Sequence, residues 1–338
     1  MHKQVSIIIP YLDELDILLS NLEILTKSSL FPSEIIIVNT GVQKLMLPSS
    51  LDSKCADNGI RVEIIDATNA FPGQARNIGL YKCSFDIVAF LDSKTIPSLD
   101  WLEMGLKQLA VDNINIVWGK TIFKADSYFE RIFRACSYGA KPLTTVPGSI
   151  FNKDALLSTG KFIESVRAGE DADWIARVKA HNIQSLTSHS LIEYRGLAEM
   201  TITNIIRKWY RNYLSASGLN YIKGHKDIYF YFISIIFIVL AFNWNSLSYD
   251  SRIGGWNLNS LVYIPNITKI ITGATILGYL FFRNIYLPLR KGIKITFIFL
   301  PHNLISIIFI SFILDVTKLL AFIHAKTLSV LSLRNRKT

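Results

Sequence analysis

Four short runs of β-branched and other apolar residues, separated by segments with helical spacing, dominate the first hundred residues. The runs are Val5–Pro10, Glu34–Val38, Arg61–Ile65 and Asp86–Leu91. Leu and Ile recur at helical spacing over residues 13–27, and a further helix is expected from Pro72 to Lys82. Continuous apolar strands that alternate with helices predict a mainly parallel sheet covered by helices. We therefore predict an α/β domain over residues 1–198.

Polar residues stand at the ends of three predicted strands. They are Asp13, Asn39 and Asp92. Ligands of open parallel sheets bind beyond the carboxyl ends of the strands, so these residues weakly indicate a nucleotide site. Ordinary turn chemistry is the alternative for each residue alone. A dinucleotide-dependent oxidoreductase is disfavoured, because Pro10-Tyr11-Leu12-Asp13 stands where such enzymes have a Gly-rich turn.

The last third of the chain contains three apolar stretches, at 228–244, 261–282 and 295–314. Each approaches the roughly 20 residues that a helix needs to cross a bilayer. The composition agrees, since 50% of the 338 residues are hydrophobic and only 18% are charged. We predict an α-helical transmembrane region over residues 227–338, and a buried helical hairpin is the alternative.

Basic residues indicate the orientation of this region. The connection 283–294 is basic and holds no acid, so the positive-inside rule places it, together with the α/β domain, in the cytoplasm. A third crossing would leave the basic tail on the far side. The alternatives are a tail helix at 316–333 that lies in the interface, or a third segment that does not fully cross. Residues 199–226 are basic, aromatic and amphipathic, and are predicted either to lie on an anionic leaflet or to close the soluble core.

The net charge of +10 fits nucleic acid, an anionic membrane or an anionic substrate. The chain has no nucleic-acid-binding motif, so a nucleic acid partner is not expected. The three scattered cysteines, Cys55, Cys83 and Cys136, suit a reducing compartment. Residues 1–5 lead directly into a strand, and no cleavable signal peptide is expected.

An acidic run, Gly169-Glu170-Asp171-Ala172-Asp173-Trp174, lies between the α/β region and the apolar stretches. Acids are favourable at a helix N-terminus, so a purely structural role is one interpretation. The other is chemical, because a carboxylate at a helix start can remove a proton from an acceptor hydroxyl.

The order of these segments resembles the family 2 glycosyltransferases, which are inverting enzymes with the GT-A nucleotide-sugar fold. The resemblance covers roughly residues 4–215. The matching pieces are Val5–Tyr11, Glu34–Asn39, Ala75–Gly79, Phe90–Pro97 and Gly169–Asp171. The apolar tail is similar to that of bacterial members that build exopolysaccharide or modify lipid-linked sugars. The resemblance thus implies a multi-pass protein of the inner (plasma) membrane, with polysaccharide or cell-envelope biosynthesis as its pathway.

The resemblance also implies roles for single residues on the donor side. Pro10, Tyr11 and Asn39 would border the base of a nucleotide-sugar donor, expected to be a UDP-sugar, although the family usually has an acid at position 39. Arg76 would face the diphosphate. Asp92-Ser93-Lys94 stands where the family has Asp-x-Asp, the motif that binds a divalent metal.

Lys94 leaves two outcomes open for the metal. Asp92 and the phosphates would still hold Mg²⁺ or Mn²⁺, which is the interpretation that we prefer, or Lys94 itself would neutralise the leaving diphosphate. A Lys94 side chain that points into solvent is a third possibility.

On the acceptor side, the resemblance implies that Asp171 is the general base. Several further residues are implied on the acceptor or diphosphate side, and Trp174 is equally well explained as a core residue. They are Gly148, Ser149, Glu170, Trp174, Arg207, Trp209 and Arg211.

These features predict a membrane-anchored, hexosyltransferase-like enzyme. It would use a nucleotide-sugar donor and a lipid-linked or growing saccharide acceptor, with membrane lipids as further partners. A polyprenyl-phosphate sugar synthase is the close variant, since it differs only in using a phosphate acceptor. A non-catalytic membrane scaffold that binds nucleotide sugar is the alternative from another class, and Asn39 and Lys94 are the residues that favour it.

Overall fold

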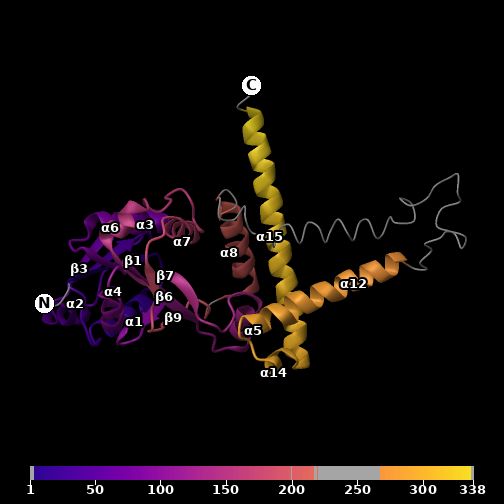
Figure 1. Cartoon of the computed structure of the whole chain (residues 1–338), viewed down its shortest axis with the longest axis horizontal. Coiled ribbons are helices and arrows are strands. Elements are labelled where there is room, and N and C mark those ends of the chain that lie inside the picture. Colours follow the sequence, from indigo (N-terminus) through magenta and orange to yellow (C-terminus); the bar gives the residue numbers. More distant parts are fainter. Residues whose placement is uncertain (1–3, 199, 217–218, 220–266, 336–338) are drawn as a thin grey trace, which may run out of the picture.

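The computed structural model describes residues 4–198, 200–216, 219 and 267–335. A mixed nine-stranded sheet with helices on both faces forms the N-terminal part, and the C-terminal helices lie to one side of it (Figure 1). The predicted segment 228–244 lies outside the described residues, as do the ends of the region 199–226 and the beginning of the segment 261–282.

The strands are short and mostly buried. They are β1 (Val5–Tyr11), β2 (Glu34–Asn39), β3 (Arg61–Asp66), β4 (Ile87–Phe90), β5 (Thr95–Pro97), β6 (Ile116–Phe123), β7 (Leu143–Asn152), β8 (Ser185–Thr187) and β9 (Ile192–Tyr194). The sheet order is β3-β2-β1-β4-β7-β6-β9-β5, and β8 pairs with β6. The first four strands are parallel to one another, whereas β7 runs antiparallel to both β4 and β6. The α/β class and the four predicted strands are confirmed.

The helices of the N-terminal part fill the connections between these strands. They are α1 (Leu15–Leu25), α2 (Ser49–Asp57), α3 (Pro72–Lys82), α4 (Trp101–Leu109), α5 (Tyr128–Cys136), α6 (Lys153–Ser158) and α7 (Glu170–Ala180). The later helical segments are α8 (Ile202–Ala216), α12 (Ile267–Phe281), the π-helix η1 (Phe282–Tyr286), α13 (Leu287–Arg290), α14 (Ile295–Ile298) and α15 (Pro301–Asn335).

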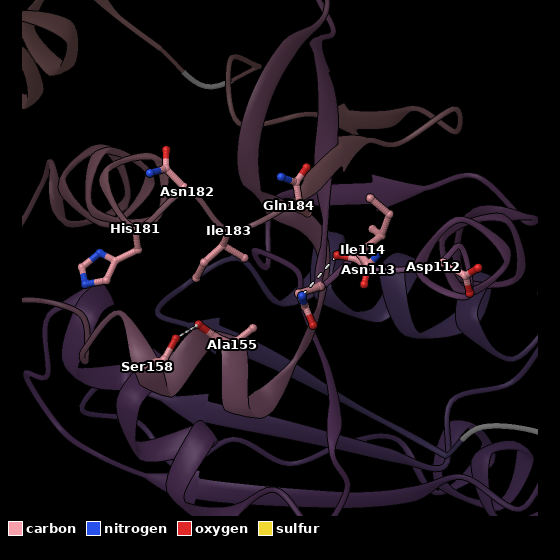
Figure 2. A pocket seen from close by; sticks show the side chains of 10 residues that line it. Asp112, Asn113, Ile114, Ala155, Ser158, His181, Asn182, Ile183 and Gln184 are labelled. Carbon is pink, nitrogen blue, oxygen red and sulfur yellow. Dashed lines mark hydrogen bonds between the residues drawn. The ribbon is translucent and has the colours of Figure 1, made fainter.

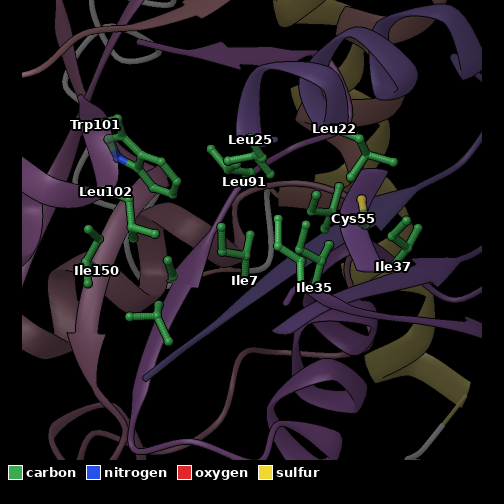
Figure 3. Packing of buried hydrophobic residues seen from close by; sticks show 14 of the residues in the cluster. Ile7, Leu22, Leu25, Ile35, Ile37, Cys55, Leu91, Trp101, Leu102 and Ile150 are labelled. Carbon is green, nitrogen blue, oxygen red and sulfur yellow. The ribbon is translucent and has the colours of Figure 1, made fainter. Parts of the chain in front are cut away.

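Alternate residues of the central strands pack into two different cores, as the two-residue period of a strand requires. Ile7 and Ile35 face α1, α2 and α4, and Figure 3 shows this cluster with Leu22 and Trp101. Ile8 and its neighbours face α3, α6 and α7 on the other side. Burial on both faces explains why these strands read as unbroken apolar runs in the sequence.

A third core joins helices that are far apart in the chain. Phe133 of α5, Trp209 of α8, Ile298 of α14 and Ile310 of α15 pack together in it. In the part of the chain that the structure describes, one helical stretch is long and apolar enough to cross a membrane. It is Pro301–Leu328, with mean hydropathy 2.2, and 39% of its apolar 18-residue window is buried inside the protein.

The C-terminal helices differ in extent from the predicted segments. The predicted helix 295–314 is divided, because α14 ends at Ile298 and α15 begins at Pro301. Proline is favoured in the first turn of a helix, where no N–H bond is lost. From there α15 continues to Asn335 and takes in the tail helix that was predicted separately at 316–333.

Candidate active site

The carboxyl ends of β1, β2 and β4 meet the N-terminus of α7 at one edge of the sheet. Arg76 of α3 lies at this meeting point. Its guanidinium is 3.0 Å from the Asp92 carboxylate, which follows β4, and 2.7 Å from the Glu170 carboxylate, which begins α7. The Arg76 side chain is only 4% exposed. One cation therefore joins two acids that are distant in the sequence.

Charge and burial act against each other within this trio. Burial lowers the pKa of Arg76, but Asp92, Glu170 and Asp171 outweigh it, and the net shift of the pKa is upward. Burial raises the pKa of Glu170 to about 7, the charge of Asp171 acts in the same direction, and Arg76 opposes it. The guanidinium carbon of Arg76 also lies 5.6 Å from the centroid of the Phe162 ring, which adds a cation–π interaction.

The Glu170 shift predicts a dependence of stability on pH. The pKa of Glu170 is raised from 4.5 to about 7, so within this window the folded chain holds a proton that the unfolded chain has released. The free energy of unfolding should therefore fall as the pH rises through the window, by roughly 1–3 kcal/mol. Glu170→Gln cannot ionise and should flatten this dependence in urea unfolding at pH 5 and pH 8. An equal pH dependence in both proteins would contradict the assignment.

Asp171, the predicted base, lies beside this trio at the start of α7. Its carboxylate accepts a hydrogen bond from the Ala172 N–H at 2.7 Å and is partly exposed. The preceding residue, Gly169, has φ +92°, which a residue with a side chain rarely adopts. Burial raises the pKa of Tyr138, as do the nearby charges of Tyr213 and Asp171, so this phenol shares the surroundings of the carboxylate.

The residues predicted to border the nucleotide base lie together at the ends of β1 and β2. Tyr11 pairs with Asn39 across the two strands, and Pro10 pairs with Val38. The Asn39 amide donates to Asp66 Oδ1 at 2.8 Å and to Gln43 O at 2.9 Å, and its oxygen accepts from Gly41 N. Asn39 is thus in direct contact with an acid, Asp66, which lies on the neighbouring strand β3.

Lys94 is held in place and does not extend freely into solvent. Its ammonium forms an ion pair with Glu14, which precedes α1, and its side chain is 31% exposed. Gly196 makes room for it, because a Cβ there would lie 2.6 Å from Lys94 Cδ and 2.5 Å from the Tyr194 hydroxyl. A fixed cation therefore occupies the position of the second acid of Asp-x-Asp.

The basic residues of α8 divide into two groups. Arg207 and Arg211 are exposed, whereas Lys208 is partly buried near Lys94. Burial lowers the pKa of Lys208 to about 8, and the charges of Lys94 and Arg211 act in the same direction. Lys208 thus interacts electrostatically with Lys94 of the candidate site and is less exposed than the two arginines predicted from the same helix.

Four other predicted residues serve the packing of the domain. Gly148 has φ +82° beside a bulge between β6 and β7, and a Cβ there would lie 2.5 Å from Ile192 Cγ1. The Ser149 hydroxyl is fully buried, donates to Thr145 O and accepts from Gly119 N. Trp174 is buried between Trp118, Phe151 and Phe162, and Trp209 packs on Phe133 and Tyr138. Both indoles are core residues and are not available to stack on a sugar.

The residues at Asp92 fit a metal ion only in part. Asp92 is 32% exposed, and one of its carboxylate oxygens bonds Arg76. Among the residues that the structure describes, no group of three or more His, Cys, Asp and Glu side chains could hold a metal ion. Mg²⁺ is often held by one or two carboxylates together with substrate phosphates. The site therefore suits a metal that arrives with a phosphate ligand and does not suit a metal held by protein side chains alone.

A surface cavity of about 830 Å³ lies elsewhere on the domain. Figure 2 shows it between the C-terminal ends of α6 and α7 and the loop before β6, where Ser158, His181 and Asn113 line it. It contains none of the predicted site residues and lies at the opposite end of α7 from Asp171. We therefore place the candidate active site at the Arg76 cluster and not in this cavity.

Several residues of this edge were missed by the sequence analysis. Lys208 lies within the basic segment 199–226 that the sequence analysis identified, and this segment was the signal that could have revealed it. Glu14 is one of three neighbouring acids, Asp66 is an isolated acid, and Tyr138 precedes a loop glycine. Their proximity to the site depends on tertiary packing, so only the folded chain reveals it.

Comparison with known proteins shows what this domain is similar to. Residues 6–154 match the model of the family described as "Glycosyl transferase family 2". The N-terminal part of the chain is thus similar to the family 2 glycosyltransferases. An uncharacterized glycosyltransferase of Rickettsia bellii is 24% identical over 209 residues, which are 57% of this chain and 29% of that protein. Glycosyltransferase AglE of Haloferax volcanii is 24% identical over 200 residues, 56% of this chain and 65% of that protein.

The domain also resembles a solved structure. This is the mannosyltransferase PcManGT from Pyrobaculum calidifontis, in complex with GDP-Man and Mn²⁺, with a TM-score of 0.51 and 11% identity. The match covers 95% of this chain and 88% of that one, and it confirms a GT-A-like fold. The chain spans less than two thirds of the length of both curated relatives, so their activities are not transferred to it directly.

Proposed function

We propose that this protein is an inverting, hexosyltransferase-like glycosyltransferase. It moves a sugar from a nucleotide-sugar donor to a hydroxyl group of a lipid-linked or growing saccharide acceptor. The observation that carries the proposal is the Arg76 bridge, which holds the donor-side acid Asp92 and the start of the Asp171 helix at one sheet edge. This arrangement supports a reaction in which the donor and the general base, Asp171, meet at the same place, as a direct displacement requires.

Each part of the site has a chemical task in this proposal. Pro10, Tyr11 and Asn39 border the nucleotide base, while Lys94 and Lys208 neutralise the diphosphate as it leaves. Asp171 takes the proton of the acceptor hydroxyl as that oxygen attacks the anomeric carbon. Arg207 and Arg211 lie on the same helix as Lys208 and supply further positive charge on the diphosphate side.

Mg²⁺ or Mn²⁺ is proposed to bind together with the donor, and Mn²⁺ accompanies GDP-Man in PcManGT. Asp92 is the residue of this chain that would hold it. A bound cation would add positive charge beside the donor phosphates, next to the charge already supplied by Lys94.

Chelation tests this metal assignment. EDTA is expected to lower sugar transfer at least about tenfold, because one carboxylate and the phosphates bind a divalent ion weakly enough for a chelator to remove it. Lys94→Asp restores a second acid and should tighten Mn²⁺ binding in the presence of UDP, as measured by electron paramagnetic resonance. Full activity in EDTA, with no gain of Mn²⁺ affinity in Lys94→Asp, would show that the metal has no part.

The location is proposed to be the cytoplasmic face of the inner (plasma) membrane, in a pathway of polysaccharide or cell-envelope biosynthesis. The exposed apolar residues of the C-terminal helices support contact with lipid, and a lipid-linked acceptor would be concentrated there. The predicted multi-pass arrangement belongs to this proposal.

A donor screen decides between the enzyme and its alternatives. The purified chain in nanodiscs would be given UDP-sugars and GDP-mannose, and released nucleoside diphosphate would be measured. We expect turnover with one donor when a saccharide or lipid-linked acceptor is present. Donor binding without turnover under all metals and acceptors would support the non-catalytic scaffold. Turnover only with polyprenyl phosphate would support the polyprenyl-phosphate sugar synthase.

A further inference from the structure

Helix α15 is attached to the N-terminal part of the protein near its beginning and again beyond its middle. Near its beginning, the Tyr128 hydroxyl of α5 lies 3.0 Å from Ser306 Oγ and donates to His302 O at 3.2 Å. Further along, the Tyr210 hydroxyl of α8 lies 2.6 Å from His324 Nδ1. Between these points, Lys318 lies over the ring of Tyr213 at 5.4 Å. Figure 1 shows α8 running beside α15.

The spacing of these attachments bears on whether α15 can cross a membrane. Ser306 and His324 are 18 positions apart, which is about 27 Å of helix. The hydrocarbon core of a bilayer is about 30 Å thick. If α15 crossed the bilayer, α5 or α8 would have to lie inside it or on its far side.

Neither helix is suited to hydrocarbon. Arg131 of α5 and both Arg207 and Arg211 of α8 are exposed. A charged side chain costs about 2.5–3.5 kcal/mol or more at the centre of a bilayer. Both helices are also tied to the catalytic domain, α5 through Arg134 Nη1 and Phe123 O at 3.0 Å and α8 through Ser215 Oγ and Arg167 N at 2.8 Å. The contacts that α5 and α8 make with α15 therefore lie on the same side of the membrane as the catalytic domain.

The two faces of α15 differ in what covers them. One face packs into the third core through Ile307, Ile310 and Leu314, which are 0–5% exposed. The other face is apolar and exposed, and its residues recur every three or four positions. They are Ile305, Phe309, Phe312, Val316, Leu320 and Ile323.

Cations flank this apolar face. Arg290 and Lys294 are exposed beside α14, whose Ile295 is also exposed, and Lys326 is exposed towards the other end of α15. Exposed apolar surface bordered by basic residues is the pattern that binds an anionic leaflet.

We propose that α15 lies in the plane of an anionic phospholipid leaflet and does not cross it. Its exposed face enters the lipid, and both of its ends remain on the side of the catalytic domain. The inference rests on the membrane association in the proposed function but not on sugar transfer. It also removes the conflict with the positive-inside rule, because the basic tail then stays with the other basic segments.

Sidedness tests the proposal in the full chain. Variants with one added cysteine, Lys294→Cys and Lys326→Cys, would be labelled with a membrane-impermeant maleimide in sealed vesicles that present the catalytic domain outward. Tyr81→Cys, at an exposed position of the catalytic domain, is the reference, and the unsubstituted chain, whose Cys55, Cys83 and Cys136 are buried, gives the background. All three variants should be labelled equally before permeabilisation. Labelling of residue 294 or 326 only after permeabilisation would overturn the proposal.

Depth provides a second measurement that does not depend on sidedness. Spin labels at Ile305→Cys, Phe312→Cys and Leu320→Cys should report one shallow depth in anionic vesicles, with Met46→Cys as the water-exposed control. In a crossing helix, the depths of labels 305 and 320 would differ by up to about 22 Å. Such a gradient, or labels that remain in water, would refute in-plane docking. Neither experiment needs a donor, so failure here would leave the transfer reaction untouched.

Discussion

Asp171→Asn is expected to lower sugar transfer by about 10²- to 10⁴-fold while donor affinity stays within about twofold. The amide keeps the size of the side chain but cannot take the acceptor proton. Initial rates with the donor found in the screen, together with isothermal titration of the same donor, would separate the two effects. The midpoint of thermal unfolding should change little, because the carboxylate bonds only the Ala172 N–H within the described structure.

Asp173→Asn is the matched control for this prediction. Asp173 lies on the same helix, but its carboxylate is held by Arg177 at 2.9 Å. This variant should keep most of the activity. If Asp171→Asn stayed fully active with a phosphate acceptor, the synthase variant would be favoured, because such an acceptor needs no base. Full activity of Asp171→Asn with a hydroxyl acceptor would disprove the base assignment.

Arg76→Met should have the largest effect on stability, lowering the free energy of unfolding by about 3–5 kcal/mol. The substitution keeps much of the side-chain length but leaves Glu170, with a side chain that is 6% exposed, without its partner. Urea unfolding followed by tryptophan fluorescence would measure this. Transfer should also be lost, because Asp92 and α7 would no longer be joined.

Two further variants show whether the pair itself is the cause. Adding Glu170→Gln to Arg76→Met should recover part of the lost stability, since the second change removes the unpaired charge. Lys107→Met breaks the exposed Lys107–Glu103 pair on α4 and should cost less than about 1 kcal/mol. Equal losses in Arg76→Met and Lys107→Met would contradict the role given to the Arg76 bridge.

Much of the fold could be predicted because it follows from local patterns. Strands β1, β2 and β4 are buried on both faces, and their sequences are accordingly mostly apolar, whereas β3 at the edge of the sheet is only half-buried. The helix start at Glu170 carries acids in its first turn, which is favourable for any helix. Asp92, Arg76 and Glu170 were each identified, and the structure brings them into direct contact.

The rest could not be predicted because it depends on tertiary partners. The predicted apolar stretch ended at residue 314 and the tail helix began at residue 316, yet α15 continues through Asp315 between them. Its carboxylate accepts bonds from Arg283 at 2.8 Å and Tyr279 at 2.9 Å, so the buried charge is paired across helices. The sequence around Lys94 likewise did not indicate its ion pair with Glu14, which is 80 residues earlier in the chain. Ser149 was predicted on the acceptor or diphosphate side, but its buried hydroxyl bonds Gly119 N and Thr145 O within the sheet.

Gly169 carries a practical consequence for anyone who shortens this protein. A Cβ at this glycine would lie 2.9 Å from Leu219 Cδ1 and 3.2 Å from Ala216 Cβ, so the turn before α7 rests against the end of α8. A fragment ending at residue 154, where the family match stops, would lack Asp171 altogether. One ending at residue 198 would retain Asp171 but remove the surface that supports its turn. The smallest fragment that preserves the geometry of the base should therefore extend to residue 219.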